Sequence, residues 1–229
     1  MYENIKLKRS RKMSYKLAIF DLDGTVLDTI DDLADAVNHV LTEFGMPCRS
    51  IDEVRAYTGN GARRLIELSA TPGTPNETVD KILSVYREYY GAHSEIKTAP
   101  YAGICEMLKK LRASGCRTAV LSNKPDAPVV TLCKKYFDGL FDYAAGEREG
   151  IIRKPSPDGI YQIMKLFGAS AAETVYIGDS EVDIETARNA GLDCISVDWG
   201  FRDRSTLIDA GAVRIVSSAD ELLSAILEQ

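Results

Sequence analysis

The sequence has no long hydrophobic segment and no overall excess of positive charge. No apolar run among its 229 residues reaches the length of about 18 residues that indicates a membrane-spanning helix. The formal net charge is −6, whereas nucleic acids and anionic membranes are bound by concentrated positive charge. We therefore expect neither a nucleic acid nor a membrane as a partner.

One local exception lies near the amino terminus, where KLKRSRK at residues 6–12 is strongly basic. This segment lacks the apolar stretch of a secretory signal. We interpret residues 1–12 as a disordered, solvated tail upstream of a second possible start at Met13. A nucleic-acid-binding arm is the alternative interpretation.

Histidine and cysteine are scarce or scattered, which limits the metal chemistry available. The chain has two histidines, His39 and His93, so we do not expect a histidine metal site. Its five cysteines are odd in number and lack metal-like spacing. Reduced thiols in a cytoplasmic protein are the expectation.

What the sequence does contain is an alternation of short apolar runs and helical patterns. The runs YKLAIF, RTAVLSN, TVYIGD and DCISVDW are rich in β-branched residues, which is typical of strands covered on both faces. Residues 102–115 and 156–168 between them have helical periodicity and end at glycine. This alternation predicts βαβ units and a doubly wound, mainly parallel sheet, a Rossmann-like α/β core made of residues 13–28 and 96–229.

The segment from 29 to 95 departs from this alternation. Residues 29–45 and 76–91 repeat apolar side chains at helical spacing, and no convincing strand pattern lies between them. We therefore predict an all-helical domain, residues 29–95, inserted after the first strand.

Polar side chains follow the predicted strands where ligands bind in an open parallel sheet. They are Asp21, Asp23, Ser122, Asn123, Lys154, Asp179, Ser180 and Asp183. Converging carboxylates repel one another, so a divalent cation is expected among them, and oxygen-only ligands favour Mg²⁺. A cation, a lysine and a serine beside a carboxylate form a site for a phosphoryl group, which one aspartate could attack.

Four stretches carry a resemblance to a known family. DLDGT, LSNK, the lysine of RKPSP and GDSEVDIETARNAG resemble, in order, the four motifs of the haloacid dehalogenase superfamily of phosphohydrolases. The resemblance extends from about Lys16 to the end of the chain.

The resemblance implies a role for each matching residue. Asp21 would be the nucleophile and a Mg²⁺ ligand, and Asp23 the general acid/base whose backbone carbonyl also reaches the metal. Ser122 would contact the phosphoryl oxygens, and Lys154 would bridge the nucleophile and the phosphate. Asp179 would be a metal ligand, and Asp183 would orient water or Lys154. We also expect Gly24, Thr25 and Asn123 to bind substrate, because Gly24 lets the backbone turn close to a phosphate.

The helical insert resembles the cap domain of the subgroup that contains phosphoglycolate phosphatase and β-phosphoglucomutase. Its stretch YTGNGARRLIE, residues 57–67, offers Asn60 and either Arg63 or Arg64 as contacts for the non-phosphate end of a substrate. A helix cap with two solvated arginines is the equally weighted alternative.

These observations predict a Mg²⁺-dependent phosphomonoesterase that acts through an aspartyl-phosphate on a small phosphorylated metabolite, most readily phosphoglycolate. Alternatives are a sugar phosphate mutase like β-phosphoglucomutase, and a pyrophosphatase or sugar-phosphate phosphatase of the same fold. Leu33 stands where the mutases carry a histidine, which disfavours the mutase. Asp23 and the helical insert disfavour a phospho-accepting signalling module. Monomer and homodimer both remain open.

Overall fold

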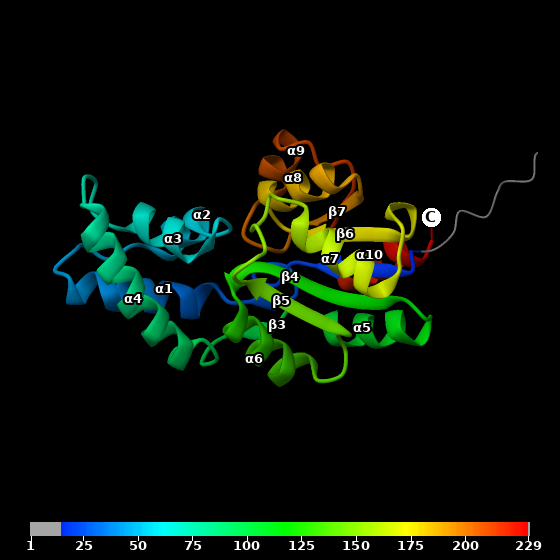
Figure 1. The fold of residues 1–229 in the computed structure, drawn as a ribbon, viewed down its shortest axis with the longest axis horizontal. Helices are drawn as coiled ribbons and strands as arrows, with labels where there is room; N and C mark the ends of the chain where they lie inside the picture. The colour runs from blue at the N-terminus through cyan, green and yellow to red at the C-terminus, as the bar shows by residue number, and fades with distance from the viewer. Residues whose placement is uncertain (1–14, 229) are drawn as a thin grey trace, which may run out of the picture.

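The computed structural model describes residues 15–228, so the predicted basic tail lies outside the described residues. Two bodies are visible in Figure 1: a sheet covered by helices, and a group of helices at the left of the view. The strands are β1 (Leu17–Phe20), β2 (Leu27–Asp28), β3 (Ala99–Pro100), β4 (Arg117–Pro125), β5 (Tyr143–Glu147), β6 (Thr174–Gly178), β7 (Asp193–Val197) and β8 (Ile215–Val216).

Six of these strands form one parallel sheet in the order β5-β4-β1-β6-β7-β8. Strand β1 lies between β4 and β6, so the winding reverses direction at β1. In such sheets the reversal opens a crevice beyond the carboxyl ends of the strands, where ligands bind. The α/β fold predicted from the alternating pattern is therefore confirmed.

The helices are α1 (Ile30–Glu43), α2 (Ile51–Tyr57), α3 (Gly61–Ser69), α4 (Asn76–His93), α5 (Ile104–Ala113), α6 (Asp126–Phe137), α7 (Asp158–Phe167), α8 (Glu181–Ala190), α9 (Arg204–Asp209) and α10 (Ala219–Leu227), with a short 3₁₀ turn at Ala171–Glu173.

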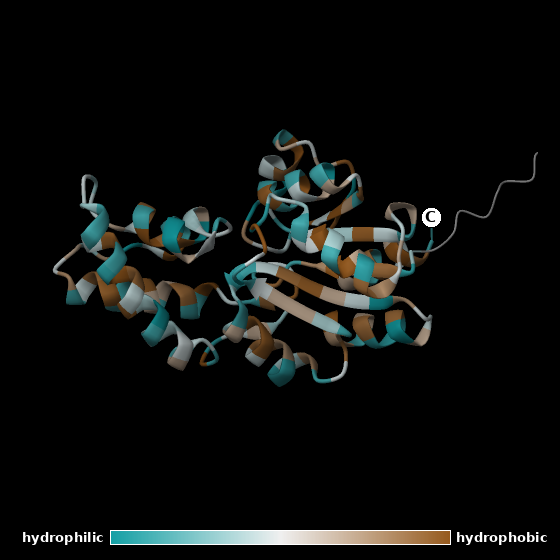
Figure 2. Cartoon of the chain, viewed as in Figure 1, coloured by the Kyte–Doolittle hydropathy of each residue, from teal (hydrophilic) through white to brown (hydrophobic). Residues whose placement is uncertain are grey.

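The sheet is covered on both faces because its strands are apolar on both faces. Phe20 and its neighbours on one face pack with residues of α5, α6 and α10. Ile19 and its neighbours on the other face pack with residues of α7 and α8. Figure 2 shows brown, hydrophobic segments on the strands, and both brown and teal segments on the helices around them.

Helices α1 to α4 have a hydrophobic core of their own, and we call residues 30–93 the helical insert. Phe201, from the loop after β7, joins that core. The chain leaves and returns through the antiparallel pair of β2 and β3. The return segment is held by Asp32, whose carboxylate accepts hydrogen bonds from the backbone N–H groups of Ile96, Lys97 and Thr98 at 2.9–3.1 Å.

The sequence pattern missed three strands. β5 has the sequence YAAGE and is only partly buried, so it lacks the apolar run of a central strand. It lies at the edge of the sheet, where it is held by backbone hydrogen bonds to β4 and its side chains need not be fully buried. β2 and β3 have two residues each, too few to show any periodicity.

Candidate active site

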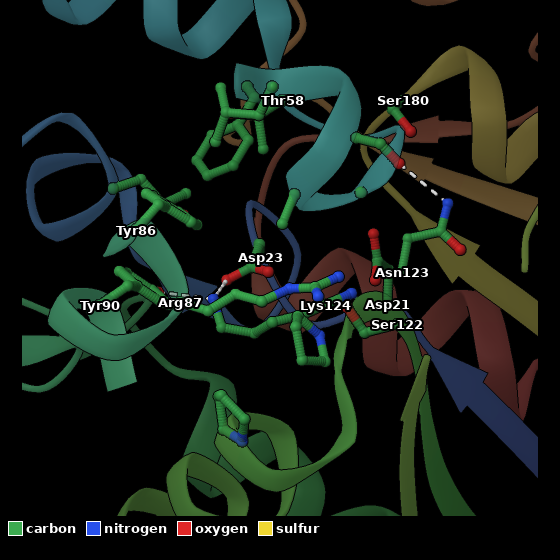
Figure 3. A pocket seen from close by; sticks show the side chains of 18 of the residues that line it. Asp21, Asp23, Thr58, Tyr86, Arg87, Tyr90, Ser122, Asn123, Lys124 and Ser180 are labelled. Carbon is green, nitrogen blue, oxygen red and sulfur yellow. Dashed lines mark hydrogen bonds and ion pairs between the residues drawn. The ribbon is translucent and has the colours of Figure 1, made fainter. Parts of the chain in front are cut away.

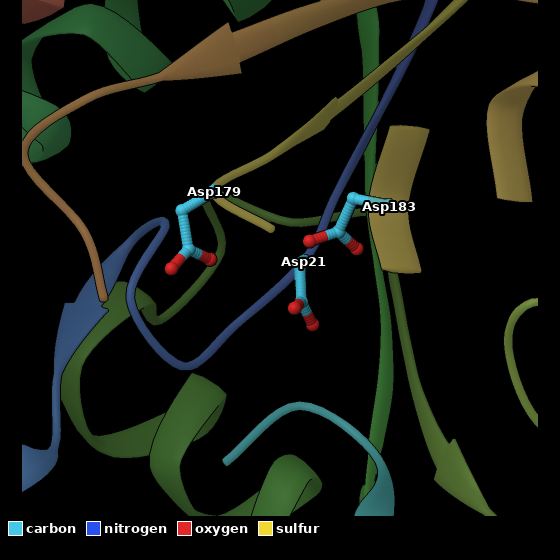
Figure 4. Close-up of side chains that lie close together, drawn as sticks. All are labelled: Asp21, Asp179 and Asp183. Carbon is cyan, nitrogen blue, oxygen red and sulfur yellow. The ribbon is translucent and has the colours of Figure 1, made fainter. Parts of the chain in front are cut away.

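Three carboxylates meet beyond the carboxyl ends of β1 and β6. Asp21 directly follows β1, Asp179 directly follows β6, and Asp183 lies in the first turn of α8. Each contributes an oxygen, and these oxygens lie within 4.8 Å of one another (Figure 4). Residues far apart in the sequence thus form one acidic cluster because the two strands are neighbours in the sheet.

Burial dominates the electrostatics of this cluster. It raises the pKa of Asp21 to about 7, although Lys154 opposes the rise, and the negative charges of Asp183 and Asp23 add to it. Burial also raises the pKa of Asp179 to about 8, with further contributions from Asp183 and Asp21. The carboxylates therefore need positive charge beside them in order to ionise together.

Lys154 supplies part of that charge. Its Nζ lies 2.9 Å from Asp21 Oδ1 and 2.8 Å from Asp183 Oδ1, and its side chain is almost fully buried. Burial alone would lower the pKa of Lys154, but attraction to Asp183 and Asp21 outweighs burial and raises it well above its usual value. One lysine between two carboxylates still leaves the cluster with net negative charge.

The cluster fits a hard divalent cation. All its donors are carboxylate oxygens, which is the ligand type that Mg²⁺ prefers. Asp179 is held by hydrogen bonds from Thr25 Oγ1 at 2.9 Å and from the backbone N–H of Phe201 at 2.8 Å. Gly24 has a φ of +80°, and a Cβ there would lie 2.3 Å from Asp179 Oδ2, so only glycine fits this close approach.

The carboxylate of Asp23 points elsewhere. Its Oδ1 accepts hydrogen bonds from Thr29 Oγ1 and Lys124 Nζ, both at 2.7 Å. Lys124 Nζ also donates to the hydroxyl of Tyr90, on α4, at 2.6 Å. Lys124 is a site residue that sequence reasoning missed. The signal was its place within LSNK, although nothing local showed that its side chain would be buried.

A cavity of about 340 Å³ lies between the sheet and the helical insert (Figure 3). Asp21, Asp23 and Ser122 line it from the sheet side, and Tyr86 and Tyr90 line it from α4. The structure therefore brings a candidate nucleophile, acid/base and phosphoryl contact to one cavity.

Asn123 also lines the cavity, but its amide group is engaged in holding other segments. Its Nδ2 donates to the carbonyl oxygens of Gly59 and Lys154, each at 3.0 Å. Its Oδ1 accepts a hydrogen bond from the backbone N–H of Lys154 at 2.8 Å. Asn123 thus connects the loop that carries Lys154 to the turn before α3.

Several residues expected to bind substrate do not line this cavity. Gly24 and Thr25 lie beside Asp179 instead. Arg63 pairs with Glu67 and Asp80, Arg64 lies 3.3 Å from Glu67, and Asn60 is the residue that precedes α3. The N-terminal turn of α3 thus presents its backbone to the cavity, through Gly59 and Gly61, and its arginines elsewhere.

The arginines that do line the cavity are Arg87 and Arg202. Arg202, after β7, donates to the backbone carbonyls of Arg55 at 2.9 Å and Thr58 at 2.8 Å, at the end of α2. Glu181 holds the same guanidinium at 2.9 Å. A partly buried arginine of the core therefore holds the helical insert by hydrogen bonds.

A strand-end aspartate beside a buried lysine, a serine and a cluster of carboxylates is the arrangement of a phosphoryl-transfer enzyme on a parallel α/β sheet. Residues 18–197 match the family model of haloacid dehalogenase-like hydrolases. The chain belongs to this family, as the four motifs predicted, and its enzyme class is a phosphatase.

Similar proteins agree with this assignment. A phosphoglycolate phosphatase from Thiobacillus denitrificans is 33% identical over 222 residues, covering 93% of this chain and 96% of the relative. A crystal structure of a provisionally assigned phosphoglycolate phosphatase from Lactobacillus delbrueckii has a TM-score of 0.91 and 38% identity, covering 95% of this chain and all of that one (100%). CbbY from Rhodobacter sphaeroides, solved in complex with phosphate, has a TM-score of 0.76 and 25% identity, covering 91% and 96% of the two chains. Among residues 15–228, no helix is long and apolar enough to cross a membrane.

Proposed function

We propose that this protein is a Mg²⁺-dependent phosphomonoesterase that acts through an aspartyl-phosphate on Asp21. The observation that carries the proposal is the position of Asp21: it lines the cavity, contacts Lys154 at 2.9 Å and belongs to the carboxylate cluster. Asp21 and Asp179 would hold Mg²⁺, which would offset negative charge on the phosphoryl oxygens and on the carboxylates.

The residues of the chain have distinct parts in this reaction. A carboxylate oxygen of Asp21 forms a bond to phosphorus while the ester P–O bond breaks, and Asp23 gives its proton to the leaving oxygen. Water then attacks the phosphoryl group, passes a proton to Asp23 and releases phosphate and Asp21. Lys154 remains charged throughout and balances Asp21, and Ser122 contacts the phosphoryl oxygens from the wall of the cavity.

For the substrate we propose a small phosphorylated carboxylic acid, of which phosphoglycolate is the reference case. Three cationic side chains, Lys124, Arg87 and Arg202, line the cavity. Lys124 and Arg202 already pair with Asp23 and Glu181, so Arg87 is the one that, within residues 15–228, has charge available for a substrate carboxylate. Arg87 replaces Arg63 and Arg64 in this role. The names of similar proteins support the choice of substrate.

A mutase is the less favoured function because of Leu33. This residue stands where the resemblance places the cap histidine of β-phosphoglucomutases, and it lines the cavity. Its side chain is apolar and transfers no proton, so this position lacks an acid/base.

We also propose that residues 29–95 act as a cap that closes over the cavity. Hydrogen bonds join the insert to the core. Asn123 donates to the carbonyl of Gly59, and Arg202 donates to the carbonyl of Thr58. Lys124 donates to the hydroxyl of Tyr90. Such contacts would exclude water once a substrate is bound. The segments at Asp28–Thr29 and Ile96–Pro100 would act as the hinges.

The test of this function is an assay of phosphate release with Asp21→Asn. This substitution retains the shape of the side chain and removes the nucleophile, so kcat should fall by orders of magnitude. Asp52→Asn, on the exposed side of α2, is the control and should match the wild type. Near-normal turnover by Asp21→Asn would refute the mechanism.

The proposed substrate is tested separately, by kcat/KM for phosphoglycolate against glucose phosphates. Arg87→Met should lower the value for phosphoglycolate about ten- to hundredfold and change the value for the neutral sugar esters less. A wild type that prefers hexose phosphates would reject the carboxylate proposal and leave the phosphatase intact.

A further inference from the structure

The part of the cavity that lies away from the carboxylates is apolar. Its walls are Leu33 of α1, Ala62 and Leu65 of α3, Tyr86 and Tyr90 of α4, and Phe201 of the core. A phosphorylated two-carbon acid would end at the cationic residues and leave this apolar part unfilled. Ligands gain affinity from such space only when they carry apolar surface into it.

The two tyrosines give this part of the cavity a defined shape. The rings of Tyr86 and Tyr90 are nearly parallel, with an interplanar angle of 5° and centroids 5.5 Å apart. Side chains four residues apart on α4 thus stack on each other, and the stacked pair forms an aromatic wall of the cavity. Flat rings pack against such a wall with more contact than a flexible chain of the same size.

The hydroxyl group of Tyr86 favours a ligand that carries a polar group at this position. Tyr86 is 3% exposed, and within residues 15–228 its hydroxyl makes no hydrogen bond, unlike that of Tyr90. Burial raises the pKa of Tyr86 well above its usual value, so the group stays protonated and able to donate. Tyr86 lines the cavity, so a ligand with a polar group at this position would give its hydroxyl the hydrogen-bond partner that residues 15–228 do not supply.

From this geometry we infer a second substrate class for the enzyme: phosphate monoesters whose leaving group carries a flat apolar ring with a hydrogen-bonding substituent. The ring lies against Tyr86 and Tyr90, and its substituent meets the hydroxyl of Tyr86. The inference rests on the phosphatase part of the proposed function and does not depend on phosphoglycolate being a substrate.

The first experiment compares benzylphosphonate with methylphosphonate as competitive inhibitors of phosphate release, because phosphonates remove differences in leaving-group reactivity. Burial of the ring should lower Ki about ten- to hundredfold relative to methylphosphonate. The 4-hydroxybenzyl compound should bind a further roughly two- to tenfold more tightly by satisfying Tyr86. Equal Ki values for the methyl and benzyl compounds would overturn the inference.

Two variants test the contribution of the apolar wall separately from that of the Tyr86 hydroxyl. Tyr86→Phe should abolish the difference between the hydroxybenzyl and benzyl compounds and leave Ki for methylphosphonate unchanged. Ala62→Leu should fill the apolar part and raise Ki for benzylphosphonate alone, whereas Ala92→Leu, on the exposed side of α4, is the matched control. If Tyr86→Phe retains the preference for the hydroxyl group, the assigned contact is wrong.

A final assay uses benzyl phosphate as substrate beside ethyl phosphate, since both leave as alkoxides. We expect a higher kcat/KM for the benzyl ester, and equal values would count against the second substrate class. Failure of the proposed function would give a different result, namely no Asp21-dependent release of phosphate from any ester.

Discussion

Arg202 should control how firmly the helical insert stays docked on the core. Its guanidinium makes two well-formed hydrogen bonds to backbone carbonyls of the insert, those of Arg55 at 2.9 Å and Thr58 at 2.8 Å. The side chain is 11% exposed, so water screens these bonds little. The perturbation that tests this role is Arg202→Ala.

The expected magnitude follows from these two bonds. Hydrogen bonds to a charged donor contribute about 1.5–3 kcal/mol each, so losing both weakens docking by at least about 3 kcal/mol. That corresponds to roughly a hundredfold shift toward the undocked insert. Arg202→Lys, which offers one compact ammonium in place of a planar fork of donors, should fall between the wild type and Arg202→Ala.

Hydrogen exchange of the peptide covering residues 51–61 is the direct assay, with kcat/KM as the functional one. The amide of Thr58, which bonds to Val54 and Arg55 at the end of α2, should exchange faster in Arg202→Ala. Arg204→Ala is the matched control, because this exposed arginine pairs with Asp198 of the core. Identical exchange in the two alanine variants would refute the docking role.

Three further predictions concern other parts of the molecule. Asp32→Ala should lower the free energy of unfolding in urea by about 3–5 kcal/mol, because it strands the buried N–H and hydroxyl groups of Thr98 and removes the bonds to Ile96 and Lys97. Asp32→Asn should cost less, and a loss under about 1 kcal/mol for the alanine variant would contradict this. Burial raises the pKa of Asp21 to about 7 and that of Asp179 to about 8, so the folded metal-free protein binds more protons than the unfolded chain does. Its free energy of unfolding should therefore fall as the pH rises from about 4 to 8. Mg²⁺ must displace those protons, so it should raise Tm more at pH 8 than at pH 6; the reverse order would show that other ligands bind it. Lys124→Met leaves the carboxylate of Asp23 without its buried partner and should lower kcat/KM at least about tenfold, whereas unchanged kinetics would remove Lys124 from the site.

The sequence alone predicted those features that depend on local residue patterns and on the common direction of parallel strands. Apolar β-branched runs can be recognised one at a time, and parallel strands all deliver their carboxyl ends to one edge of a sheet. That rule placed Asp21 and Asp179 together although they are 158 residues apart in the sequence. The position of Lys154 beside Asp21 was instead implied by the resemblance to the family's motifs. The helical character of residues 30–93 followed in the same way, from periodicity within each helix.

Only the tertiary structure decided which side chains of the insert meet the core. Arg63 and Arg64 lie close in the sequence to the glycines that line the cavity, but α3 turns Arg63 toward Asp80 and lines the cavity with Gly61, Ala62 and Leu65. Arg202 and Tyr90 make their contacts because the insert docks on the core, and local spacing does not encode contacts between segments that are 147 and 34 residues apart. Side-chain periodicity fixes which face of an element is apolar, whereas the docking of one folded body on another selects which polar residues become part of the site.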